Sequence, residues 1–185
     1  MTDSIYSHIA NFDGNWGTME FRKASLALPV THIHLVAHEN QENVGGDGQP
    51  PANHWTISLQ VGSNSSVRID MVPGEPGRPG MVVLQNKSYD LTTKRTCAVS
   101  AEVTTGTTVA SILSLIINKK RDNYVYSPLG EGCRFWVSTV VSDLASEGVI
   151  LLDKANEAQS ALAQYWPYPT GTEPTARAIV PGRFF

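Results

Sequence analysis

The first half of the chain alternates apolar and polar positions, a pattern that predicts β-strands. In residues 54–61 every second residue is apolar, which is typical of a strand with one buried face. A Gly-Ser-rich turn follows, and residues 67–72 return as a second strand, so that residues 54–72 predict a hairpin. Similar runs of β-branched and apolar residues predict three more strands at 29–38, 81–84 and 96–103.

After residue 104 the apolar spacing changes to that of helices. Thr107 or Thr108 can cap a helix that runs to about Asn118. A second helix is predicted from Cys133 to about Ser146, and a third over 153–165 with Asp153 as its N-cap. The apolar positions of the second helix fall on one face, which we expect to be buried. They are Cys133, Trp136, Val137, Val140, Val141 and Leu144.

These elements predict a single α+β domain over residues 1–185. We expect an antiparallel sheet of about five strands, packed against two or three helices. The predicted parts are a surface segment (1–24), the sheet (29–103), the helices (105–165) and an extended tail (166–185). The tail holds prolines and ends in aromatic residues, which we expect to dock on the body of the domain.

Composition and charge exclude several classes of protein. Hydrophobic residues make up 41% and charged residues 17% of the 185, as in ordinary globular domains. The net charge is −3, and the one basic cluster, 119–121, suits the end of a helix. We therefore expect no nucleic-acid partner. The first residues resemble no signal peptide, and every apolar run is shorter than the ~20 residues of a membrane span.

We accordingly predict a cytoplasmic protein without a membrane span. In that compartment Cys97 and Cys133 are expected to stay unpaired. The apolar C-terminus is compatible with a homodimer.

The predicted chemistry centres on Cys133. It follows Gly130-Glu131-Gly132 and begins a helix, whose N-terminal N–H groups favour a thiolate and could hold an oxyanion. His54 at the start of a strand is a candidate base for this thiol. Asp70, on the returning strand of the same hairpin, could orient the imidazole, or it could pair with Arg68 instead. A small buried core cysteine is the alternative.

Around these three catalytic candidates, other residues are candidates for binding a small-molecule substrate. Aromatic side chains would line the pocket and charged ones would contact polar groups of the substrate. These candidates are Trp55, Arg68, Tyr126, Glu131, Arg134, Phe135 and Trp136.

Two segments carry a resemblance to known enzymes: HWTISLQVGSNSSVRIDMVP at 54–73 and GEGCRFWV at 130–137. They are similar to the circularly permuted papain-like enzymes, which include the lecithin retinol acyltransferase group and permuted NlpC-type hydrolases. There a strand beginning His-Trp precedes a hairpin, and a helix beginning Asn-Cys-Glu-His-Phe carries the nucleophile. The matching positions are His54, Trp55, Cys133 and Phe135. Gly132 and Arg134 depart from that pattern, and Asp70 is the one candidate for its further polar residue. The resemblance implies a papain-like permuted fold and a Cys-His pair.

The whole chain also resembles an uncharacterised family of small fungal proteins. The shared motifs are Asn-His-Trp, a Val-Arg-Ile-Asp-Met-like strand and Gly-Glu-Gly-Cys-Arg-Phe-Trp, at 53–55, 67–71 and 130–136 here. Some members of such families belong to natural-product pathways, which implies a biosynthetic role.

A competing constellation lies at His32 and His34. Together with Glu39 and Gly46 they have the spacing of the first metal motif of cupins. The second cupin motif is absent from the sequence, and residues 105–165 are helical where a jelly roll needs strands. We therefore predict no metal and no cofactor, and keep His32, His34 and Glu39 as the alternative.

Three classes of function follow from the sequence. The first is a small-molecule-modifying enzyme, such as a fungal natural-product cyclase, isomerase or acyl-transfer enzyme, with its pocket around His54 and Cys133. The second is a Cys-His hydrolase or acyltransferase that acts through a thioester. The third is a non-catalytic binding module.

Overall fold

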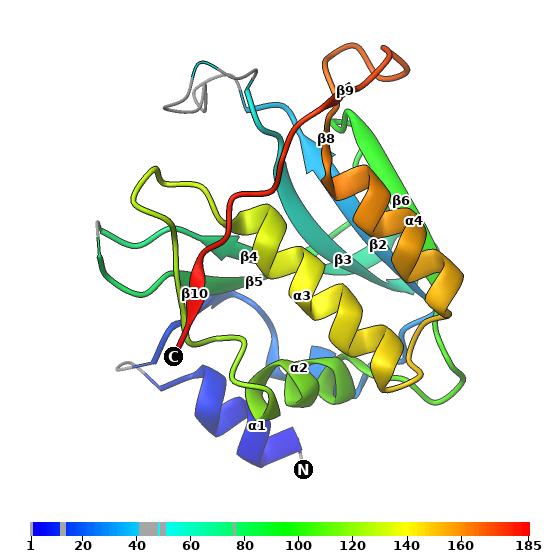
Figure 1. Ribbon diagram of the computed structural model, residues 1–185. Coiled ribbons are helices and arrows are strands. Elements are labelled where there is room, and N and C mark those ends of the chain that lie inside the picture. The colour runs from blue at the N-terminus through cyan, green and yellow to red at the C-terminus, as the bar shows by residue number, and fades with distance from the viewer. Residues whose placement is uncertain (1, 12–13, 41–47, 49–50, 76) are drawn as a thin grey trace.

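A mixed sheet of six strands organises the part of the chain that the structure describes (Figure 1). The structure is a computed structural model, and it describes residues 2–11, 14–40, 48, 51–75 and 77–185. The strand order is β1-β5-β4-β3-β2-β6. Neighbours pair antiparallel except β1 and β5, which are parallel. The strands are β1 (Trp16–Glu20), β2 (His32–His38), β3 (His54–Gly62), β4 (Ser65–Val72), β5 (Met81–Lys87) and β6 (Cys97–Glu102).

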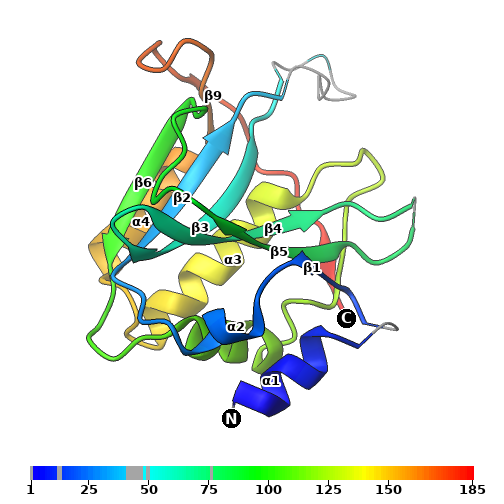
Figure 2. The same cartoon turned by 180° about the vertical axis from the view of Figure 1, so that it is seen from behind.

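Helices α3 and α4 lie against one face of this sheet. Figure 1 shows α3 crossing that face with α4 beside it, and Figure 2 shows the opposite face, where the strands stand in front of α3 and α4. None of the helices among the described residues is long and apolar enough to cross a membrane. The bounds are α1 (Thr2–Ile9), the 3-10 helix η1 (Lys23–Ala27), α2 (Val109–Asn118), α3 (Cys133–Ser146) and α4 (Leu152–Leu162).

The core lies between the sheet and α3. Trp55, Ile57 and Leu59 project from β3 into it and are completely buried, as the alternation predicts. The apolar face predicted for α3 is buried as well, and this confirms both the helix and its orientation. The predicted start of α2 is also confirmed, because Thr108 forms a capping box with Ser111.

The first 24 residues differ from the predicted surface segment, because they contain α1 and β1. Buried Asp122 ties them to the body: its Oδ2 accepts from Trp16 Nε1 at 3.0 Å and lies 2.8 Å from His8 Nε2. An eight-residue helix is too short to show a clear period, and a parallel pairing with β5 has no local signal. The sheet is therefore larger than predicted, and it is mixed. α4 also begins earlier than predicted, and its N-cap is Leu151, not Asp153.

The sheet opens between β3 and β4. Their pairing ends at Ile57 and Ile69. Beyond that point residues 54–56 stay with β2, while residues 70–72 stay with β5. Both views show the two pairs of strands diverging (Figures 1 and 2). The start of β3 and the end of β4 thus form the two sides of a gap, which polar side chains can enter.

The C-terminal tail closes the fold through short strands. β10 (Arg183–Phe184) pairs antiparallel with β7 (Tyr124–Val125), and β9 (Thr175–Ala176) pairs with β8 (Gln164–Tyr165). The ring centroid of Phe184 lies 4.8 Å from that of Tyr124 and 6.1 Å from that of Phe135. The predicted docking of the terminal aromatics is therefore confirmed for Phe184, whereas Phe185 is 55% exposed.

We predict that Phe184→Ala lowers the free energy of unfolding by about 2 kcal/mol, because it removes a half-buried ring from an aromatic cluster. The matched control, Phe185→Ala, removes an exposed ring and should change it by less than about 0.5 kcal/mol. Urea unfolding followed by far-UV circular dichroism measures both. Equal effects of the two variants would contradict the assigned docking.

Candidate active site

His54 and Asp70 meet across the gap between β3 and β4. Nε2 of His54 lies 2.7 Å from Oδ1 of Asp70, a hydrogen bond in which the imidazole N–H donates. The other carboxylate oxygen, Oδ2, lies 3.1 Å from Nη2 of Arg68. The two partners considered for Asp70 therefore both bind it, one on each oxygen. His54 keeps 28% of its side chain exposed, while Asp70 is almost completely buried.

Cys133 stands at the first turn of α3 beside this pair. Its Sγ lies 3.9 Å from the carbonyl oxygen of Asn53, the residue before His54. Cys133 also lies close enough to the His54 imidazole to raise the pKa of that ring. The structure thus brings the three catalytic candidates, Cys133, His54 and Asp70, together.

The charges around His54 favour its protonated form. Burial by itself would lower the pKa of His54, but the hydrogen bonds and charges of Asp70 and Cys133 outweigh burial and raise the pKa to about 10. Burial would likewise raise the pKa of Asp70, but His54 and Arg68 hold it below its ordinary value. The pair is therefore an imidazolium and a carboxylate near neutral pH.

Two tyrosines fix the start of α3. The hydroxyl of Tyr124 donates to the carbonyl oxygen of Gly132 at 2.8 Å, and that of Tyr126 donates to the carbonyl oxygen of Met71. Position 132 must be glycine for this packing. A Cβ there would lie 2.7 Å from Oη of Tyr124 and 3.1 Å from the ring of Tyr126. Burial raises the pKa of both tyrosines, which keeps the hydroxyls protonated as donors.

Glu131 and Arg134, two of the predicted binding residues, form a buried network with the C-terminal tail. Oε2 of Glu131 lies 3.2 Å from Nη2 of Arg134, and Oε1 lies 2.6 Å from Nη2 of Arg177. Arg134 also donates to the carbonyl oxygens of Leu162, Arg177 and Ala178. The structure therefore places these two side chains as a tie between α3, α4 and the tail.

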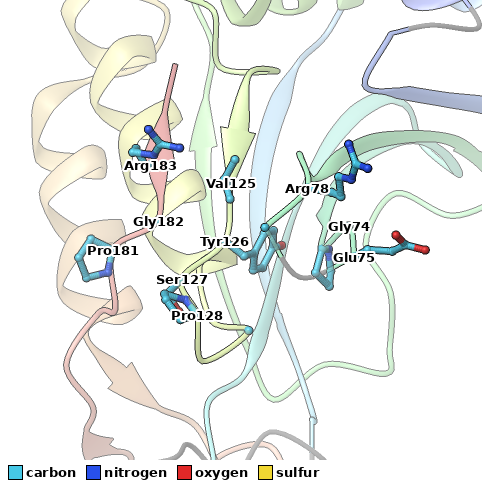
Figure 3. Close-up of a pocket in the computed structure, with 13 residues that line it drawn as sticks. Gly74, Glu75, Arg78, Val125, Tyr126, Ser127, Pro128, Pro181, Gly182 and Arg183 are labelled. Atoms are coloured by element: carbon cyan, nitrogen blue, oxygen red, sulfur yellow. The ribbon is translucent and has the colours of Figure 1, made fainter.

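The four predicted aromatic pocket residues lie in three different places. Trp55 and Trp136 are completely buried in the core, and Nε1 of Trp136 donates to the carbonyl oxygen of Arg121 at 2.6 Å. Phe135 packs on Phe184. Tyr126 lines a pocket of about 640 Å³, and it is the one predicted binding residue among the described residues around that pocket (Figure 3).

The alternative metal constellation does not come together. The rings of His32 and His34 stack in parallel with centroids 5.9 Å apart. Both nitrogens of His34 have hydrogen-bond partners, Ser100 at 2.7 Å and Gln60 at 3.2 Å. Among the residues that the structure describes, no group of three or more His, Cys, Asp or Glu side chains could hold a metal ion. Gly46, the last position of the cupin-like spacing, lies outside the described residues.

Asn53 also belongs to the site, although the sequence indicated it only as part of a motif and not as a site residue. Its buried side chain accepts from the N–H of Trp166 at 2.7 Å and donates to the carbonyl oxygens of Trp166 and His38 and to Oγ1 of Thr96. These bonds fix the backbone just before His54 and next to Cys133. The one sequence signal was its place in the Asn-His-Trp motif.

The chain is therefore an α+β domain in which a cysteine, a histidine and an aspartate lie together where two strands of the sheet separate. The chain belongs to the family described as Domain of unknown function (DUF7770), whose model matches residues 33–185. No curated protein and no solved structure matches the chain significantly.

The raised pKa of His54 predicts how stability depends on pH. The folded chain binds this proton more tightly than the unfolded chain, whose histidine has an ordinary pKa near 6.5. The resulting stabilisation is complete below that value and is lost as the pH rises toward 10. The stability difference between the wild type and His54→Gln should therefore shrink over this range. Urea midpoints measured at several pH values test this, and a constant difference would refute it.

Proposed function

We propose that this protein is a cysteine-dependent acyl-transfer or hydrolytic enzyme that acts on a small-molecule substrate through a thioester. The observation that carries the proposal is the 2.7 Å hydrogen bond from Nε2 of His54 to Asp70, with Cys133 beside the same imidazole and raising its pKa. This is the arrangement of an activated nucleophile, its base and an orienting group.

The residues would act in two steps. Cys133, whose proton already resides on His54, attacks the acyl carbon of the substrate, and the His54 imidazolium gives that proton to the leaving group as the thioester forms. Water or a second substrate next loses a proton to the neutral His54 and attacks the thioester, which releases Cys133 and restores the starting pair. Asp70 holds the imidazole in the required orientation. Main-chain N–H groups at the start of α3 would stabilise the oxyanion in both steps.

The sequence resemblance to permuted papain-like enzymes supports the proposal of a cysteine-dependent enzyme. There too a strand beginning His-Trp and a helix beginning with the cysteine carry the chemistry. His54 and Cys133 occupy these positions on β3 and α3. A biosynthetic role in natural-product formation would suit an acyl-transfer reaction on a small molecule.

A second candidate function is acid–base catalysis by His54 and Asp70 alone, as in a cyclase or isomerase. Exposure favours this alternative, because His54 keeps 28% of its side chain exposed while Cys133 is 9% exposed. In that case the thiol would be part of the wall of the site.

Thiol reactivity tests the nucleophile directly. We expect iodoacetamide near neutral pH to label Cys133 at least about tenfold faster than Cys97, since burial raises the pKa of Cys97 to about 11. Peptide mass spectrometry over time measures both rates in one sample. His54→Ala should slow the labelling of Cys133 and leave that of Cys97 unchanged. Labelling of Cys97 at an equal or higher rate would rule out an activated Cys133.

Turnover of a simple ester separates the two candidate functions. With p-nitrophenyl acetate we expect a burst of p-nitrophenol and an acetyl group on Cys133, found by mass spectrometry. Cys133→Ser should lose at least about a hundredfold in rate. Full turnover by Cys133→Ser, with loss in His54→Ala, would instead favour acid–base catalysis. Unchanged turnover in both variants would exclude both schemes.

A further inference from the structure

The pocket beside Tyr126 is built from three segments that are distant in sequence (Figure 3). One wall comes from residues 73–75, 77 and 78 between β4 and β5, and another from residues 125–128 and 130, which lead to α3. The third wall comes from residues 181–183 of the tail. A volume of about 640 Å³ lies within the range of about 300–1,000 Å³ that is typical of pockets for small molecules.

The lining of this pocket suits a flat apolar body with one polar contact. The ring of Tyr126 lines the pocket, and Pro73, Pro128 and Pro181 add further apolar surface. Ser127 also lines the pocket, and its Oγ is buried without a hydrogen-bond partner among the described residues. Buried hydroxyls are rarely left unpaired, so this oxygen is suited to a hydrogen bond with a bound molecule.

The charged side chains at the pocket are mostly positive. Arg78 and Arg183 stand on opposite sides of Val125 and Tyr126 (Figure 3). Within the described part of the chain, neither guanidinium takes part in an ion pair. Glu75 is the one acidic residue of the lining, and its carboxylate extends away from Tyr126. Two unpaired guanidinium groups at one pocket favour an anion, because each can donate two parallel hydrogen bonds to a carboxylate or phosphate.

Tyr126 connects the pocket to the candidate active site. It lines the pocket, and a Cβ at position 132, next to Cys133, would lie 3.1 Å from its ring. Its hydroxyl binds the carbonyl oxygen of Met71, the residue after Asp70. Tyr126 therefore contacts both the pocket and the two segments that carry Cys133 and Asp70.

We propose that this pocket binds the anionic end of the substrate, so that the substrates of Cys133 are acyl compounds that carry a carboxylate or phosphate group. This inference rests on the proposed function for the identity of the reacting residue. Arg78 and Arg183 bind the anion, the Ser127 hydroxyl binds a further polar atom, and Tyr126 with the prolines packs on the apolar body.

Binding to Cys133→Ser tests the pocket without the reaction. In isothermal titration calorimetry we expect 4-phenylbutyrate or 3-phenylpropyl phosphate to bind at least about tenfold more tightly than 4-phenylbutanol. The anion that binds more tightly shows whether the pocket prefers a carboxylate or a phosphate. Adding Arg78→Gln and Arg183→Gln together should abolish the preference, whereas Arg22→Gln, an exposed arginine outside this pocket, should preserve it.

Equal binding of the alcohol and the anions, a preference that survives in the double arginine variant, or no binding of either anion at millimolar concentration would each overturn the inference.

Turnover separates this inference from the proposed function. We expect kcat/KM for the mono-p-nitrophenyl ester of adipic acid to exceed that for p-nitrophenyl hexanoate by about tenfold. In the double arginine variant, kcat/KM for the adipic acid ester should fall to the value for the hexanoate ester. Turnover that needs Cys133 but is equal for the two esters would refute the anion pocket and leave the nucleophile standing. If the anions bind through the arginines but turnover does not depend on Cys133, the pocket is confirmed and the nucleophile is refuted.

Discussion

The packing of α3 on β3 and β4 is the constraint on which the rest of this structure depends. Trp136, Val140 and Leu144 on the helix and Trp55 on the sheet are completely buried. Each side chain of this kind contributes roughly 1.5–3 kcal/mol when it leaves water, so this contact contributes substantially to the stability of the fold. The position and rotation of the helix follow from it. Cys133 shares the same face, so its thiol has to point toward the sheet.

The gap between β3 and β4 gives this inward thiol polar neighbours. Where two strands pair, their backbone groups satisfy each other and their side chains project to the two faces of the sheet. Beyond Ile57 and Ile69 the strands separate, and the side chains of His54 and Asp70 bridge the space instead. A buried carboxylate is costly without partners, and here His54 and Arg68 each take one of its oxygens. A charged pair is thereby kept next to a cysteine.

The elements around the site are held by buried polar groups of the same motifs. Glu131, Arg134 and Arg177 lock the tail to α3 and α4, while Asn53 ties the start of β3 to the segment at Trp166. Removing one member of a buried ion network leaves the others uncompensated, which is strongly destabilising. The Gly-Glu-Gly-Cys-Arg segment therefore combines a candidate nucleophile with the ties that hold its surroundings, and both lie within four residues of Gly130.

The sequence by itself determined the local elements and their buried faces. Alternation located β3 and β4, and runs of β-branched and apolar residues located β2, β5 and β6. Apolar spacing indicated α3 and the inward side of Cys133, and Thr107 or Thr108 indicated the start of α2. These signals arise from residues close together in the chain. The sequence also offered His54 and Asp70 as partners of Cys133, with Arg68 as another partner of Asp70 and the histidine pair as an alternative site. Only the tertiary structure showed which of these side chains meet. Which side chains meet depends on where β3 and β4 part, on the parallel addition of β1 and on the docking of the tail, and these are contacts between distant segments that leave no periodic trace in the sequence.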